Sequence, residues 1–244
     1  MNLHCFDSEP AWIDGVCSIW RDRLRTTPDL KICLPSGTTP AGIYAEMVRS
    51  VRAELVSFAH ASVFALDEFG GVAADDPGRT SHTLRRQLID DVDLPPQGFH
   101  SLNPDHPDIA QHCADYDAAI GDGFDLMLLG IGLNGHLGMN EPGSPVNSPT
   151  RRVELHGGTI QSSARYFAHQ DLPRWGLTVG LDAVLTSKEV WVVANGAAKA
   201  DIVQRTVRGE IGPSNPASLL RRHPNCSLFL DAAAGSLLNR RDLA

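Results

Sequence analysis

Five short runs of apolar residues recur along the chain, at residues 30–34, 62–66, 125–129, 190–194 and 226–230. Each run is nearly continuous in its apolar character and does not alternate with polar residues. Runs of this length and kind are typical of strands that are buried on both faces of a parallel sheet. The sequence therefore predicts at least five such strands.

Between these runs the apolar residues follow a helical period. Ile43, Met47 and Val51 recur at four-residue steps. A second stripe has the i, i+4, i+7, i+11 spacing of an amphipathic helix and consists of Ile109, Cys113, Tyr116 and Ile120. The alternation of strands and helices predicts an α/β fold, an open, mainly parallel sheet with helices on both faces.

Ligands of such sheets bind beyond the carboxyl ends of the strands. The residues that follow the apolar runs are therefore the first place to look for chemistry. This criterion selects the segments 36–40, 67–69, 130–141 and 196–199.

Composition narrows the class of protein. The chain has 244 residues and a formal net charge of −8, which argues against nucleic acid as a partner. No apolar stretch approaches the roughly 20 residues that a bilayer requires, and no secretory signal precedes the first run, so we expect no membrane partner. We expect one domain over residues 1–244.

Five cysteines are dispersed along the chain without a Cys-x-x-Cys pair. An odd, scattered set argues against a disulfide framework and against a thiolate zinc site. Cys33 and Cys226 lie within apolar runs, which is typical of small buried side chains. We therefore expect a cytoplasmic protein.

The loop after the run at 30–34 combines small and hydroxyl-bearing residues, Ser36, Gly37, Thr38 and Thr39, with Pro40. Thr39 is predicted to cap a helix whose first residue is Pro40. Gly37 lets the backbone approach a ligand, and free N–H groups at a helix start bind anions. The segment is either an anion-binding loop or an ordinary capped turn.

The loop after the run at 62–66 contains Asp67 and Glu68. Neighbouring side chains on an extended segment point to opposite sides, so we expect one of these carboxylates, not both, to face a shared cleft. Asp67 is a candidate general base. A helix cap or a solvated charge is the alternative.

The segment 130–143 is rich in glycine and proline, which excludes a regular helix through it. Asn134, His136 and Glu141 within it can form a hydrogen-bonded relay in which imidazole moves a proton. Their spacing does not fit a His-Glu-x-x-His metal site, and the Gly-x-Gly is weak support for a dinucleotide. A glycine-rich connector with an incidental histidine is the alternative.

Lys199 is predicted in the first turn of a helix, after the run at 190–194. A cation there opposes the helix dipole unless an anion is bound nearby. A solvated lysine is the alternative.

Taken together and in this order, the segments LPSGTTP, LDEF, DLMLLGIGLNGHLGMNEPG, SSARYF, LTVG, GAAKA and NPASLLRRHP resemble those of glucosamine-6-phosphate deaminases. The resemblance spans roughly residues 36–223. The related 6-phosphogluconolactonases share the Ser-Gly-x-Thr-Pro loop, here residues 36–40, and the Gly-His pair, here Gly135 and His136. They lack the Asn-Glu-Pro found here as Asn140, Glu141 and Pro142, which places the chain with the deaminases.

The resemblance implies a modified Rossmann-like three-layer sandwich and separate roles, in binding or in catalysis, for the candidate residues. It implies that the sugar 6-phosphate is bound by Ser36, Gly37, Thr38, Thr39, Arg165 and Lys199. It also implies that Asp67 abstracts the C2 proton and that His136, supported by Glu141, opens the sugar ring. No metal or organic cofactor is implied.

The sequence departs from the common family pattern at three positions. Asn134 stands where many members have Asp, so this side chain orients its neighbours without adding charge. Phe69 and His82 stand where Tyr is common, which leaves the preferred sugar epimer open.

The expected activity is the conversion of glucosamine 6-phosphate and water to fructose 6-phosphate and ammonia. The alternatives are a galactosamine-6-phosphate deaminase, a lactonase-like hydrolase and a non-catalytic sugar-phosphate sensor. The expected partner is a small sugar phosphate, and a homo-oligomer is left open.

Overall fold

Seven parallel strands form the central sheet of the computed structural model, which describes residues 1–167, 172–239 and 242. Their order is β1-β10-β9-β6-β2-β3-β5, and every neighbouring pair is parallel. The strands are β1 (Asn2–Phe6), β2 (Lys31–Leu34), β3 (Ser62–Ala65), β5 (Phe99–His100), β6 (Leu126–Gly130), β9 (Val190–Ala194) and β10 (Cys226–Asp231). The five predicted strands are confirmed.

The two strands that the apolar pattern did not predict, β1 and β5, lie at the edges of this sheet. Neither contains a fully buried residue. Because edge strands lack the continuous apolar run of a central strand, they leave little signal in the sequence.

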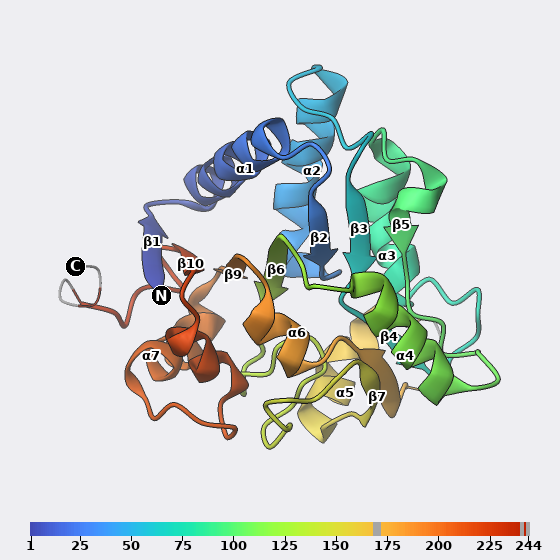
Figure 1. The fold of residues 1–244 in the computed structure, drawn as a ribbon. Helices are drawn as coiled ribbons and strands as arrows, with labels where there is room; N and C mark the ends of the chain where they lie inside the picture. The colour runs from blue at the N-terminus through green and yellow to red at the C-terminus, as the bar shows by residue number, and fades with distance from the viewer. Residues whose placement is uncertain (168–171, 240–241, 243–244) are drawn as a thin grey trace.

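Helices cover both faces of the sheet (Figure 1), which confirms the α/β fold class. One face carries α1 (Glu9–Thr26), α2 (Thr38–Arg52) and α3 (Thr80–Gln87). The other carries α4 (Ile109–Ile120), α6 (Leu181–Thr186) and α7 (Ala200–Arg208). Five short 3-10 segments occur among the described residues: Ile89–Asp91, Pro96–Gly98, Ala164–Tyr166, Ala197–Lys199 and Pro216–Arg222.

Strand β9 shows why the central runs are apolar throughout. Trp191 and Val193 pack under the first layer of helices, whereas Val190, Val192 and Ala194 pack under the second. All five are at most 1% exposed. Burial of both faces therefore requires every residue of the strand to be apolar.

A second, three-stranded antiparallel sheet was not predicted. It consists of β4 (Asp67–Gly70), β8 (Trp175–Thr178) and β7 (Arg151–Glu154), in the order β4-β8-β7. Leu66 joins the two sheets, because its N–H donates to Leu34 of β2 while its carbonyl accepts from Val179, just beyond β8. This junction fixes the position of Asp67, the first residue of β4.

The start of α2 differs from the prediction. The helix begins at Thr38, and Gly37, not Thr39, is the N-cap residue. Gly37 has a φ of +122°, in the region that favours glycine, so it can turn the chain where Thr39 cannot. Pro40 is the third helical residue, still within the first turn, where a missing N–H breaks no intrahelical hydrogen bond.

The order of the strands places a topological switch point between β2 and β6. The chain proceeds from β2 to β3 and β5 on one side, and later to β6, β9 and β10 on the other. The loops that leave β2 and β6 therefore diverge, and a ligand-binding crevice is expected between their carboxyl ends.

All five cysteines are free, and four of them are buried, in line with the prediction. Across the part of the chain that the structure describes, no helix has the length and apolarity needed to cross a membrane.

Gly180 is a sensitive point of the fold because a Cβ there would lie 1.9 Å from the carbonyl oxygen of Ser148. The backbone of the 148–149 segment must then move away from the start of α6. We expect Gly180→Ala to lower the free energy of unfolding by about 1–3 kcal/mol, measured by urea denaturation. Gly212→Ala is the matched control, since a Cβ added there would have no atom of the described chain within 4 Å. Equal midpoints for the two variants would contradict this account of the packing.

Candidate active site

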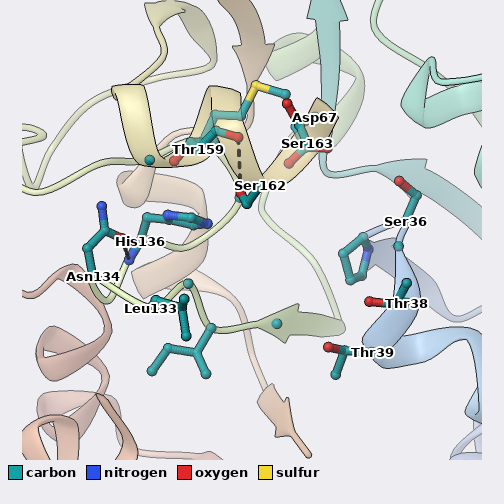
Figure 2. Close-up of a pocket in the computed structure, with 18 of the residues that line it drawn as sticks. Ser36, Thr38, Thr39, Asp67, Leu133, Asn134, His136, Thr159, Ser162 and Ser163 are labelled. Atoms are coloured by element: carbon teal, nitrogen blue, oxygen red, sulfur yellow. Dashed lines mark hydrogen bonds between the residues drawn. The ribbon is translucent and has the colours of Figure 1, made fainter. Parts of the chain in front are cut away.

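A cavity of about 810 Å³ lies at the carboxyl ends of β2, β3, β6 and β9. Nine of the ten predicted site residues line it: Ser36, Gly37, Thr38, Thr39, Asp67, Asn134, His136, Arg165 and Lys199. The tenth, Glu141, lies behind Asn134 and His136. In Figure 2 the residues of the first loop, Ser36 to Thr39, lie across the cavity from Asn134 and His136.

The loop after β2 is held from behind by Gln87 of α3. The Gln87 amide donates to the carbonyl of Gly37 at 2.9 Å and accepts from its N–H at 3.3 Å. Among the residues that the structure describes, no side chain caps the start of α2 or accepts from its first N–H groups, which also lack intrahelical acceptors. This is the geometry of an anion-binding helix start. No pattern in the sequence predicts the contact of Gln87 with Gly37, because it depends on how α3 packs beside the loop.

Two cations lie at the same end of the cavity. The Lys199 ammonium donates to the carbonyl of Ile131 at 2.6 Å, and the Arg165 guanidinium lies 3.4 Å from the Thr38 hydroxyl. Within the described ranges, neither has a carboxylate within 4 Å. Burial lowers the pKa of Lys199, and repulsion from the nearby charge of Arg165 lowers it further. A bound anion would relieve this repulsion.

Lys199 lies slightly earlier than predicted. It ends the short 3-10 turn Ala197–Lys199 and is the N-cap residue of α7, not a residue of its first turn. Its side chain still reaches the cavity, so the starts of α2 and α7 both contribute to its lining.

Of the described residues that line the cavity, Asp67 is the acidic one. Burial, together with the charge of Glu68, raises its pKa to about 7, and the neighbouring Thr80 side chain opposes this rise. A carboxylate with this pKa can accept a proton near neutral pH and release it again.

Glu68 points away from the cavity, as predicted for its position beside Asp67. Its carboxylate is buried and accepts the backbone N–H groups of Phe69 at 2.8 Å, Thr80 at 2.7 Å and Ser81 at 2.9 Å. It thereby fastens the start of α3 to β4. Burial raises the pKa of Glu68, and these hydrogen bonds oppose the rise.

Asn134, His136 and Glu141 form one cluster on the loop after β6. Asn134 donates to Glu141 at 2.8 Å and accepts from the backbone N–H of His136 at 3.1 Å. The His136 Nδ1 lies 3.6 Å from a Glu141 oxygen, an ion-pair distance that exceeds an ordinary hydrogen bond. The amide therefore orients the carboxylate and the loop and does not bond to the imidazole.

Thr159, from α5 (Gly157–Ser163), completes this cluster by donating its hydroxyl to Glu141. Burial alone would raise the pKa of Glu141, but His136, Thr159 and Asn134 outweigh it and lower the pKa to about 2. Glu141 therefore stays a carboxylate throughout the neutral range. Thr159 lies 18 residues from Glu141, and no local pattern in the sequence predicts this contact.

Gly132, which is small, and Asn140, which is buried, fix the shape of the loop after β6. The His136 ring packs against Gly132, where a Cβ would lie 2.3 Å from the ring. Asn140 is fully buried and donates to the carbonyls of Leu137 and Val179 while accepting from Arg151. Asn140 thus joins the loop to the end of β8 and has a structural function.

Phe69 and His82, which stand where Tyr is common in the family, lie in different places. Phe69 lines the cavity and packs edge-on against Phe167, with ring centroids 5.1 Å apart. His82 is outside the lining, with its Nδ1 3.0 Å from the carbonyl of Asp76. Phe69 is therefore the one of the two that can contact a bound ligand directly.

The cavity thus combines a proton acceptor, an imidazole with a carboxylate partner, and a cationic end to which no described residue supplies a counterion. Among the described residues, no group of three or more His, Cys, Asp or Glu side chains is arranged to hold a metal ion. The arrangement suits acid–base chemistry on a small molecule that carries an anionic group.

Comparison with known proteins gives consistent matches over nearly the whole chain. Residues 10–228 match the family described as glucosamine-6-phosphate isomerases/6-phosphogluconolactonase. A glucosamine-6-phosphate deaminase of Bacillus pumilus is 38% identical over 240 residues, covering 97% of this chain and 100% of the relative. One from Rhodopirellula baltica is 38% identical over 223 residues, covering 90% of this chain and 89% of the relative.

Solved structures agree with these matches. A monomeric glucosamine-6-phosphate deaminase of the NagB superfamily has a TM-score of 0.93 at 31% identity, covering 97% of this chain and 100% of its own. A 6-phosphogluconolactonase from Trypanosoma brucei has a TM-score of 0.76 at 19% identity, covering 98% of each chain. The second likeness concerns the fold alone.

The raised pKa of Asp67 can be tested directly. Replacing Glu68 with Gln keeps an acceptor oxygen for the start of α3 but removes the neighbouring charge, which favours ionisation of Asp67. We expect the Asp67 pKa to fall below its value of about 7, measured from the pH dependence of its carboxyl carbon by NMR. The exposed Glu210→Gln is the matched control and is expected to leave it unchanged. An Asp67 that titrates identically in Glu68→Gln would refute the coupling.

Proposed function

The chain belongs to the glucosamine-6-phosphate isomerase/6-phosphogluconolactonase family, and from that premise we propose that it is a glucosamine-6-phosphate deaminase. It converts glucosamine 6-phosphate and water to fructose 6-phosphate and ammonia. The observation that carries the proposal is the pairing, in one cavity, of a carboxylate whose pKa is about 7 with a cationic end that has no counterion among residues 1–167, 172–239 and 242.

The cationic end binds the 6-phosphate of the sugar. Backbone N–H groups at the start of α2, the Ser36, Thr38 and Thr39 hydroxyls, and the charges of Arg165 and Lys199 are all available to a phosphate dianion. Phosphate bound here would neutralise the repulsion between the two cations.

His136 opens the sugar ring, which must precede chemistry at C2 because the substrate is mainly cyclic. The imidazole takes the proton of the anomeric hydroxyl and returns a proton to the ring oxygen, so that C1 becomes an aldehyde. Glu141 is ionised and 3.6 Å away, which stabilises the imidazolium that forms in between.

Asp67 then moves the proton that isomerises the sugar. Its carboxylate removes the C2 hydrogen from the ammonium form of the substrate, and a proton of that ammonium group passes to the C1 oxygen, which gives a neutral enolamine. The resulting carboxylic acid then delivers a proton to C1. The product carries an iminium group at C2. Addition of water there and loss of ammonia yield the ketone of fructose 6-phosphate.

Three narrower statements stay predictions. The preferred epimer is glucosamine over galactosamine, supported by the names of the relatives that are 38% identical. A cytoplasmic location is supported by five free cysteines. The sequence leaves homo-oligomerisation open, and a deaminase that is 31% identical to this chain is described as monomeric.

The direct test of the proposed function is ammonia release from glucosamine 6-phosphate, followed with a coupled glutamate dehydrogenase assay. Galactosamine 6-phosphate and a 6-phosphogluconolactone serve as parallel substrates. We expect the first substrate to be turned over with the highest kcat/KM. Lactone hydrolysis without ammonia release would assign the site to the other branch of the family.

The pH dependence follows from the proposed role of Asp67. A base must be ionised to accept a proton, and ionisation of Asp67 is complete only above its pKa of about 7. We therefore expect kcat/KM of the native enzyme to fall as the pH is lowered through about 7.

Replacement of the base tests the same role. We expect Asp67→Asn to lower kcat by roughly 10²–10⁴ with substrate binding largely retained. Persistent exchange of the C2 hydrogen with solvent deuterium in Asp67→Asn would place the base elsewhere.

Lys199→Ala tests the phosphate subsite. Loss of a charge-assisted contact costs about 1.5–3 kcal/mol, so we expect KM for the phosphorylated sugar to rise roughly 10- to 150-fold. The matched control is Lys188→Ala, whose ammonium pairs with Asp125 on the surface, and there KM should be unchanged. Steady-state kinetics give both values. Equal turnover of unphosphorylated glucosamine by the native enzyme would be incompatible with the phosphate assignment.

A further inference from the structure

Tyr166 is a cavity residue to which neither the sequence motifs nor the proposed mechanism gives a role. It ends the 3-10 segment Ala164–Tyr166 and directly follows Arg165. Its side chain is half-buried, and its hydroxyl is close to the first loop, since a Cβ on Gly37 would lie 3.5 Å from it. The hydroxyl is therefore located at the cationic end of the cavity.

The contacts of Tyr166 with Arg165 are of two kinds. Arg165 Nη2 lies 3.0 Å from the Tyr166 hydroxyl oxygen, and the guanidinium carbon lies 5.0 Å from the centroid of the tyrosine ring. The ring and the hydroxyl both hold the guanidinium beside Thr38, whose hydroxyl is 3.4 Å from the same nitrogen. Tyr166 thus helps to aim Arg165 at the first loop.

The direction of the hydrogen bond decides what the tyrosine can do next. A guanidinium has no acceptor, so Arg165 donates and the tyrosine oxygen accepts. The hydroxyl proton of Tyr166 then has no protein acceptor within the described residues. A hydroxyl that accepts from a cation is polarised and becomes a better donor.

We propose that the Tyr166 hydroxyl donates a hydrogen bond to the phosphate of the substrate, as a further binding residue beside Arg165 and Lys199. This inference rests on the proposed function, because it takes the anion at this subsite to be a sugar 6-phosphate. The tyrosine contacts the phosphate and not the reacting carbons, so it contributes equally to the ground state and the transition state. Its loss should therefore raise KM and leave kcat nearly unchanged.

Tyr166→Phe isolates the hydroxyl, since the ring that packs against the guanidinium is retained. We expect KM for glucosamine 6-phosphate to rise roughly 10-fold, with kcat within about 2-fold of the native value. The dissociation constant of inorganic phosphate, measured by isothermal titration calorimetry, should rise by a similar factor. The matched control is Tyr116→Phe, whose hydroxyl bonds to the carbonyl of Ala65 outside the cavity lining, and there phosphate affinity should be unchanged.

The two measurements separate the inference from its premise. An unchanged phosphate dissociation constant in Tyr166→Phe, or a fall in kcat at constant KM, would overturn the assignment of this hydroxyl. If the native protein releases no ammonia from glucosamine 6-phosphate, the proposed function fails. The phosphate titration of Tyr166→Phe then still decides whether this hydroxyl binds the anion.

Discussion

Backbone hydrogen bonds between β2 and β6 join two parts of the chain that lead away from each other, and the cavity depends on this pairing. Ile32 lies opposite Leu126 and Cys33 opposite Met127 in parallel register. Parallel strands end at the same edge of a sheet, so the loop that carries Ser36 and the loop that carries His136 face each other. Strands β3 and β9 flank this pair and add Asp67 and Lys199 to the same edge.

Opposite charges are kept apart within this cavity, and the separation gives the site its chemistry. Arg165 and Lys199 have no carboxylate within 4 Å among the described residues, and Asp67 has no cation at that distance. A phosphate can therefore neutralise one end while Asp67, with a pKa of about 7, stays available to the carbon skeleton. Glu68 maintains this arrangement from behind, because it fastens α3 to β4 and its charge raises the pKa of its neighbour.

Strands buried on both faces and loops rich in glycine leave strong local patterns, so the central sheet and the four loops that line the cavity were predictable from the sequence. The antiparallel sheet was not, because β4 and β7 are short and partly exposed. Contacts between segments that are distant in the sequence could not be predicted from local patterns either. They are Gln87 with Gly37, Thr159 with Glu141, and Glu68 with the start of α3. The cap of α2 was assigned to Thr39 because hydroxyl side chains are the usual signal, whereas the positive φ of Gly37 appears only in three dimensions.

In the proposed mechanism one sugar phosphate spans the cavity, with its phosphate at the cationic end and its C2 atom at Asp67. The most direct test is a crystal structure of Asp67→Asn with 2-amino-2-deoxyglucitol 6-phosphate, an open-chain compound that cannot isomerise. We expect the phosphate between the start of α2 and Lys199, with C2 about 3–3.5 Å from the side chain of residue 67. A phosphate bound next to His136, or a C2 atom that faces Glu141, would contradict it.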